Sequence, residues 1–268
     1  IVNLFTFIAT EVREILAILG FKSLNDIIGR TDLLMQVNKA SPNLDDLDLN
    51  PLLVQTDPGE NPRYCVERGI NKVPDTLDEK IWDEIETKVS LTNKVNVEYE
   101  IQNTDRAVGT RLSHYLYKKF GYNKLPENSC QINLKGSAGQ SLGAFLTKGI
   151  KLIVNGDAND YVAKGLSGGL IVVRPSGLSN LSSNENVIVG NTVLYGATNG
   201  KLFASGKAGE RFAVRNSGGL AIVEGCGSNG CEYMTGGMTI ILGPVGDNFA
   251  AGMTGGISFV YDPKNEFE

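Results

Sequence analysis

The chain has 268 residues, 41% of them hydrophobic, and a formal net charge of −5. This length supplies enough material for a sizeable core in one large or two small domains. The acidic balance argues against a general binder of nucleic acid or anionic membranes, and no uncharged apolar run approaches the ~20 residues of a membrane span.

The first 34 residues predict two helices. One helical stripe, closed by Gly20, holds the apolar residues Phe5, Ile8, Val12, Ile15, Leu16 and Leu19. Ser23 is expected to cap a short second helix that ends at Gly29. The opening run from Ile1 to Ile8 is similar to a signal-peptide core but lacks a basic start, so we interpret it as protein interior. Since there is no initiating Met, we expect a piece of a longer chain.

Residues 35–94 predict a connector with one helix. The segment from Met35 to Asp75 is rich in Asn, Asp and Pro and has little periodicity. An amphipathic helix is then expected to begin after Asp75 or Thr76, with Leu77, Ile81, Trp82, Ile85 and Val89 on its apolar side. Further on, alternation from Val95 to Ile101 predicts a half-buried strand. A helix capped by Thr104 or Asp105 should follow and end at Gly121.

Glycines organise the rest of the chain. From Gly136 onward lie 26 of the 32 glycines, and glycine pairs beginning at residues 168, 218, 236 and 255 each precede a short apolar run. The last three pairs are 18 and 19 residues apart, a period typical of a repeat architecture. A repeat this short has no room for the crossover helix of a βαβ unit, so its strands must stack directly on one another.

This pattern predicts a mainly β chain, with a parallel β-helix over residues 95–268 behind the α-helical amino-terminal segment. The interval between Gly168 and Gly200 is too long for one repeat. We interpret it as two turns with residues 175–186 as a polar outer loop.

No catalytic, cofactor-binding or metal-binding residue is predicted. The run Gly136–Gly143 has neither dinucleotide-binding nor P-loop spacing, and corner glycines explain it better. Gly156–Asp160 matches no calcium loop and is expected to be a polar turn. His114 has no partner in the sequence pattern and is assigned to a helix surface.

Charged pairs and cysteines in the chain also have structural interpretations. Glu210-Arg211 and Arg215-Asn216 are expected at exposed strand positions or in satisfied ion pairs. The four cysteines contain no CxxC, although Cys226 and Cys231 could be metal ligands or a disulfide. Reduced buried thiols are the favoured interpretation for this set: Cys65, Cys130, Cys226 and Cys231.

Several long motifs resemble the large subunit of glutamate synthase. They are NTDRAVGTRLS from Asn103, GLSGG from Gly165, the run from Gly190 to Gly219, CEYMTGG from Cys231 and NFAAGMTGGISFV from Asn248. The segment from Glu11 to Leu34 is similar to the tail of that enzyme's FMN-binding synthase domain. The resemblance covers nearly the whole chain and implies residues 1–34 as that tail, 35–94 as a connector and 95–268 as the glycine-rich domain.

The resemblance implies a parent enzyme that makes glutamate from glutamine and 2-oxoglutarate. The parent contains an amidotransferase domain, FMN and an iron–sulfur cluster. For residues 95–268 the resemblance implies a right-handed β-helix that acts as a non-catalytic spacer. None of the catalytic parts maps onto this chain, so the fragment alone is expected to be inactive and to hold no cofactor. Expected partners are the synthase and amidotransferase domains of the same chain and a small reductase subunit or domain, in the cytoplasm or a plastid.

Two other classes of protein are alternatives to a glutamate synthase domain. A subunit of a formylmethanofuran dehydrogenase has a similar glycine-rich coil, but the segment GRTDLL from Gly29 has no role there. A left-handed β-helix acyltransferase would place glycines at multiples of six, as between Gly200 and Gly236. That fold requires a hexapeptide apolar repeat and a histidine within the coil, whereas His114 precedes it.

Overall fold

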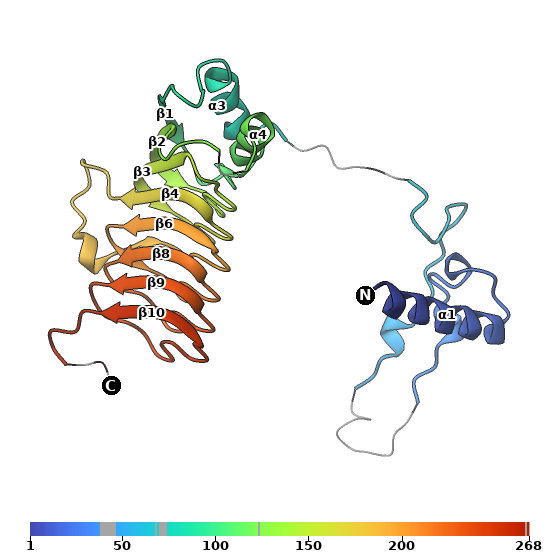
Figure 1. The fold of residues 1–268 in the computed structure, drawn as a ribbon. Coiled ribbons are helices and arrows are strands. Elements are labelled where there is room, and N and C mark those ends of the chain that lie inside the picture. The colour runs from blue at the N-terminus through green and yellow to red at the C-terminus, as the bar shows by residue number, and fades with distance from the viewer. Residues whose placement is uncertain (38–46, 68, 70–73, 123, 266, 268) are drawn as a thin grey trace. The chain divides into compact units, whose positions relative to one another are not determined.

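The computed structural model describes residues 1–37, 47–67, 69, 74–122, 124–265 and 267 (Figure 1). Its contacts divide the chain into two compact units, Ile1–Val73 and Pro74–Glu268. In the connector predicted over residues 35–94, residues 38–46, 68 and 70–73 lie outside the described part. Among the described residues, no helix is long and apolar enough to cross a membrane.

The first unit is built around α1 (Val2–Leu19). As predicted, this helix ends at Gly20, which adopts a left-handed conformation with φ 79°. The predicted second helix is only a 3₁₀ turn, η1 (Leu24–Asp26), where the Asp26 carboxylate accepts a hydrogen bond from the Ser23 N–H at 3.0 Å. Two more 3₁₀ turns follow, η2 (Thr31–Leu33) and η3 (Asn50–Leu52).

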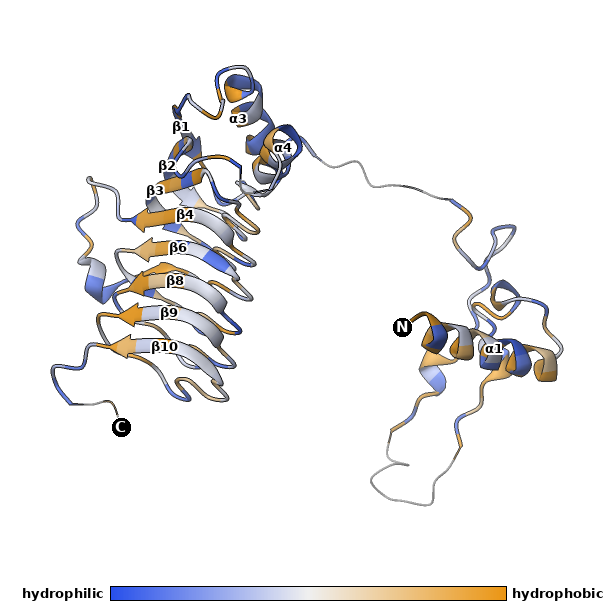
Figure 2. Ribbon diagram, in the orientation of Figure 1, coloured by the Kyte–Doolittle hydropathy of each residue, from blue (hydrophilic) through white to orange (hydrophobic). Residues whose placement is uncertain are grey.

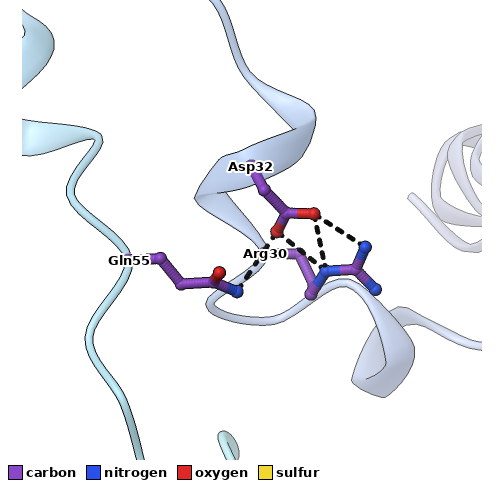
Figure 3. A network of polar contacts seen from close by, with 3 residues as sticks. All are labelled: Arg30, Asp32 and Gln55. Carbon is purple, nitrogen blue, oxygen red and sulfur yellow. Dashed lines mark hydrogen bonds and ion pairs between the residues drawn. The ribbon is translucent and has the colours of Figure 1, made fainter.

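A polar network joins two segments of this unit (Figure 3). The Arg30 guanidinium donates to both carboxylate oxygens of Asp32, and the Gln55 amide donates to the same carboxylate at 3.2 Å. The Gln36 side chain likewise donates to the Leu47 carbonyl and accepts from the Leu49 N–H, both at 2.8 Å. Residues 47–55, which we predicted to be part of a separate connector, therefore pack against residues 30–36.

The second unit begins with a helical pair beside the first strand. These elements are α3 (Leu77–Ile85), β1 (Val95–Ile101) and α4 (Thr110–Phe120). The predicted start of α3 after Thr76 and the strand from Val95 to Ile101 are confirmed. The predicted start of α4 is wrong because Ala107 and Gly109 have φ of 53° and 97°, which no right-handed helix can contain.

Ten parallel strands form one sheet in the order β1-β2-β3-β4-β6-β8-β9-β10 (Figure 1). The strands after β1 are β2 (Cys130–Ala138), β3 (Ile150–Ala158), β4 (Ser167–Arg174), β5 (Val187–Val189), β6 (Asn199–Ala204), β7 (Lys207–Ala208), β8 (Ser217–Val223), β9 (Thr235–Ile241) and β10 (Gly255–Val260). Short β5 lies off the main path and pairs with β3 and β7.

The predicted right-handed parallel β-helix is wrong. The structure instead assigns all ten strands to a single parallel sheet, accompanied by few helices, and the segments between the long strands are mainly turns. A glycine period reports how many residues separate successive strands, and it does not specify what the intervening residues form. The helical amino-terminal segment is present as expected.

The long interval between the glycines of β4 and β6 was also misread. We interpreted it as two turns, but Leu170 pairs directly with Lys201, so the interval is one step of the main sheet. The extra residues form the outer loop, the 3₁₀ turn η4 (Ser183–Glu185) and β5.

The turns between strands contain a repeated unusual backbone. Every second residue is left-handed, for example Arg211, Ala213 and Arg215 with φ of 55° to 60°. The N–H groups of Arg211 and Arg215 donate to the following repeat, at Ser228 and Glu232, whereas the Ala213 N–H donates to Val193 of the preceding repeat. Left-handed conformations are costly for residues other than glycine, so these bonds must stabilise them.

The core covers one face of the sheet and is continuous from strand to strand. Residues in register on neighbouring strands bury the same face, as Leu152, Ile171 and Leu202 do on β3, β4 and β6. Such stacking removes a row of aliphatic side chains from water and provides the main driving force for the fold.

Candidate functional site

The other face of the sheet carries an uninterrupted row of apolar residues. We call this row the outer stripe, and the strand register aligns its members on six neighbouring strands: Ile153, Val172, Phe203, Ile222, Ile240 and Phe259. Each points away from the core because its neighbours along the strand point inward. The stripe is half-buried on five strands, and Phe259 on β10 is 54% exposed.

A second apolar row runs beside the outer stripe. Leu170, Leu220, Met238 and Ile257 occupy it on β4, β8, β9 and β10, and the last two are 37% and 51% exposed. In Figure 2 apolar residues gather toward the carboxyl ends of these strands. With strands about 4.8 Å apart, six strands give a stripe about 24 Å long. Contiguous exposed apolar surface of this kind is typical of an interaction site.

A groove of about 450 Å³ opens on this face at the beginnings of β3, β4 and β6. Glycine backbone forms much of its lining, at residues 149, 168, 169 and 200. Leu170 and Phe203 contribute apolar side chains, and Asn128 and Asn199 contribute amides. The groove is therefore shaped for a side chain or short segment with both apolar and polar groups.

Basic residues surround this part of the stripe. Lys148 and Lys201 line the groove together with one acid, Glu127. Lys151 and Arg174 lie on the same face, on β3 and β4, where the Arg174 Nε donates to the Asn155 amide oxygen at 2.8 Å. Among the described residues, none of these four cations forms an ion pair. A chain with an overall negative charge thus concentrates positive charge here.

The first unit presents a separate apolar surface on α1. The predicted stripe residues Phe5, Ile8, Ile15 and Leu19 are 64%, 46%, 49% and 52% exposed, and Leu16 is the buried member of the helix. The first ten residues carry no charged side chain. A helix that is apolar on nearly all sides is normally surrounded by other protein.

The glycine and aspartate runs from the sequence analysis lie at strand ends. A Cβ at Gly139 would come within 2.5 Å of the Asn103 carbonyl oxygen, so close packing explains this glycine. In the second run, Asn159 accepts from the Asp160 N–H and Asp160 accepts from the Asn191 N–H, both at 2.7 Å. The second bond ties adjacent repeats together, whereas the first is local to the turn.

The charged candidates are dispersed. His114 is exposed on α4. Arg211 and Arg215 lie in turns, so the expected strand positions are wrong, and neither forms the alternative ion pair among the described residues. Asn216 does not lie at the exposed strand position that was one of the two expectations, since it is fully buried and bonds to the backbone of Gly218 and Gly219. No group of three or more His, Cys, Asp or Glu in the described part of the chain could hold a metal ion.

All four cysteines are free, and three of them are buried. Burial raises the pKa of the Cys130 thiol and that of the Cys226 thiol to about 12, and it also raises the pKa of Cys231. Cys231 lies 3.3 Å from the Thr239 hydroxyl, which bonds to Ser258 at 2.7 Å. These thiols stay protonated and unreactive at neutral pH.

A thiol count tests this arrangement. A disulfide reagent added to the native protein should titrate one thiol, the exposed Cys65, and all four after unfolding. The Cys65→Ser variant is the control and should give no rapid reaction while folded. Rapid titration of a second thiol in the native protein would contradict the burial of the other three.

The outer stripe was not predicted, although the sequence contains a signal for it. The runs after the glycine pairs are apolar at every position, as in Leu170–Val173, and not at alternate positions. Continuous apolar strands are expected where both faces of a sheet are covered. Half of the side chains in these runs lie outside the core.

Comparison with known proteins identifies the family to which the chain belongs. The profile of the GXGXG motif family matches residues 78–268. The chain is 64% identical over 98% of its length to the glutamate synthase [NADPH] large chain of Azospirillum brasilense, 48% identical over its full length to the glutamate synthase [NADH] of Schizosaccharomyces pombe, and 46% identical over 92% of its length to ferredoxin-dependent glutamate synthase 2 of Synechocystis. It spans only 17%, 13% and 16% of these relatives. The chain belongs to the GXGXG motif family.

Proposed function

We propose that this chain is a structural domain of a glutamate synthase, which forms L-glutamate from L-glutamine and 2-oxoglutarate. The observation that carries the proposal is identity across almost the entire chain, reaching 64% with the Azospirillum brasilense large chain. The three relatives described above are all glutamate synthases, although their electron donors are named as NADPH, NADH and ferredoxin. This favours a synthase domain over a formylmethanofuran dehydrogenase subunit.

In this proposal the chain positions other domains and performs no chemistry. Residues 1–34 are the tail of the FMN-binding synthase domain, 35–94 are a connector and 95–268 are the glycine-rich domain. The exposed apolar side of α1 supports the first assignment, because it needs a covering surface from the rest of the parent. Free cysteines fit a reducing compartment such as the cytoplasm or a plastid.

The cysteines of this chain do not fit the parent's iron–sulfur cluster. An iron–sulfur cluster requires several cysteine ligands, and the described residues form no such group. Three of the cysteines are buried protonated thiols. We therefore assign the cluster to other parts of the parent chain. The resemblance places FMN there as well, and a reductase partner would also act there.

The isolated chain provides a first test. Purified residues 1–268 should have no flavin absorbance and should neither hydrolyse glutamine nor form glutamate, whereas the full-length parent should do both. A stoichiometric flavin spectrum from the isolated chain would contradict the assignment of FMN to the missing domains.

A second test uses the full-length enzyme. Ile8→Asp with Ile15→Asp places two charges on the exposed apolar side of α1, and should uncouple glutamine hydrolysis from glutamate formation or lower stability. Thr10→Asp with Ala17→Asp is the matched control, because these positions lie on the opposite side of the helix. Normal stability and tight coupling in the Ile8, Ile15 variant would contradict a docking role for α1.

A further inference from the structure

We infer that the basic end of the outer stripe is a docking surface for an acidic, apolar-anchored surface of another domain of the same longer chain. This inference rests on the proposed function and adds which face of the sheet is covered and with what chemistry. The stripe alone shows only that apolar surface is available. The charge around it and the groove within it identify the occupant.

Shape is the first step. The groove of about 450 Å³ brings Leu170 and Phe203 together with the backbone of four glycines. Side chains larger than glycine do not fit at these positions, because neighbouring atoms lie too close. A Cβ at Gly200, for example, would lie 2.8 Å from the Gly169 carbonyl oxygen. The glycine lining is therefore a consequence of the fold, and it leaves a recess beside the apolar rows. An apolar side chain can enter this recess and contact Leu170 and Phe203.

Charge is the second step. Lys148 and Lys201 line the groove with one acid, Glu127; Lys151 lies beside it on β3, and Arg174 lies on the same face at the end of β4. Within the described part of the chain, none of these four cations forms an ion pair. Acids also lie on this face: Glu98 and Glu100 are exposed on β1, where Glu98 pairs with Lys135, and Asp157 is exposed on β3. A second copy docked face to face on this end would bring lysines against lysines. An acidic partner surface would instead complement all four cations.

The source of the occupant is the third step. The relatives contain roughly six times as much chain as this one, since it covers 17% of the Azospirillum brasilense protein. A domain of the same chain meets the stripe at a high effective concentration, so modest apolar and ionic contacts suffice to hold it. This favours an intrachain domain over a free partner protein.

Thiol labelling of the full-length enzyme tests the inference. In a Cys65→Ser background, the substitution Asn199→Cys places a thiol in the groove and leaves all four cations in place. Leu178→Cys is the control, because Leu178 is 95% exposed on the outer loop. We expect Cys at 199 to react about tenfold or more slowly than Cys at 178 in the full-length enzyme, and the two to react at similar rates in residues 1–268 alone.

Charge reversal tests whether the surface that covers the groove is acidic. Lys148→Glu with Lys201→Glu, added to the Asn199→Cys enzyme, should raise its labelling rate about tenfold. The control variant is Lys80→Glu with Lys118→Glu, on α3 and α4. It changes the net charge by the same amount as the first pair and should leave the labelling rate unchanged. Equal rates at 199 and 178 in the full-length enzyme, or no effect of the first pair, would overturn the inference.

Two further outcomes identify a different occupant. Protection of position 199 that rises with enzyme concentration would show a second copy, and protection that appears only with anionic vesicles would show a membrane; either overturns the intrachain assignment. Glutamate formation is measured on the same samples. An active enzyme with an unprotected groove refutes the docking surface alone, whereas a full-length protein without synthase activity refutes the proposed function.

Discussion

Gly236→Ala should unfold the sheet domain at a distinctly lower urea concentration, with a loss of about 3 kcal/mol or more in the free energy of unfolding. Gly236 begins the apolar run of β9 and pairs with Ser217 of β8. A Cβ at this position would lie 2.3 Å from the Ser217 carbonyl oxygen and 3.0 Å from its carbon. Backbone atoms of a neighbouring strand cannot move aside without opening the ladder, so the two strands must separate.

Gly177→Ala is the matched control. Gly177 lies in the outer loop, and a Cβ there would meet nothing within 4 Å. The change should stay within about 0.5 kcal/mol and could be slightly stabilising, because alanine restricts the unfolded chain. Unfolding followed by the circular dichroism of the sheet compares the two variants. Equal midpoints would show that the glycine spacing does not reflect strand packing.

The glycine pattern predicted this crowding but gave an incomplete account of the backbone. Glycine can be required at a position by a positive φ or by the close approach of a neighbouring backbone. Within the glycine pair of β9, Gly237 has φ of 83°, whereas Gly236 is required by the close approach of β8. Sequence spacing cannot separate these two causes, because each is met by glycine alone.

The turns could not be predicted for a related reason. Left-handed residues are expected to be glycine or asparagine, yet Tyr161, Leu194 and Arg211 adopt this conformation. Their N–H groups bond to neighbouring repeats, at Asn191, Val162 and Ser228. Tertiary hydrogen bonds thus override a local preference. The single sheet was missed in the same way, since it depends on how these turns are held.

The interaction surface was only partly predictable. The stripe on α1 follows from its helical period, and the structure shows that the unit containing it leaves the stripe largely exposed. The outer stripe and its cations come together through strand register. Lys151 and Lys201 are 50 residues apart in sequence, but each pairs with Leu170 on β4. Such proximity is a property of the sheet and not of any local motif.

The other large effect is expected at Asp78, a buried carboxylate that caps α4 from a different helix. Asp78 is 1% exposed, and its oxygens accept from the N–H groups of Gly109, Arg111 and Leu112 at 2.7, 2.8 and 3.1 Å. Position 109 cannot supply its own capping side chain, because it has φ of 97° and a Cβ would lie 2.9 Å from Leu146. Asp78 therefore replaces the missing N-cap.

Asp78→Ala should lower the free energy of unfolding by about 3 kcal/mol or more, because it leaves two buried N–H groups and one partly buried N–H group without an acceptor. Asp83→Ala removes an exposed carboxylate from the same helix and should cost within about 0.5 kcal/mol. Urea unfolding of both variants measures the difference. Similar midpoints would mean that water or another group satisfies the amino-terminal end of α4.

The pH dependence of the stability of Asp78→Asn, compared with that of the wild type, tests whether the Asp78 carboxyl is responsible. Burial raises the pKa of the Asp78 carboxyl above its ordinary value and outweighs the three backbone hydrogen bonds, which lower it. A raised pKa in the folded state means that this carboxyl's contribution is fully present below its ordinary pKa, about 4, and is lost as the pH rises through the raised value. Asparagine does not titrate, so the stability gap between the wild type and Asp78→Asn should narrow over that range. A gap that widens would show that the hydrogen bonds outweigh the cost of burying the charge.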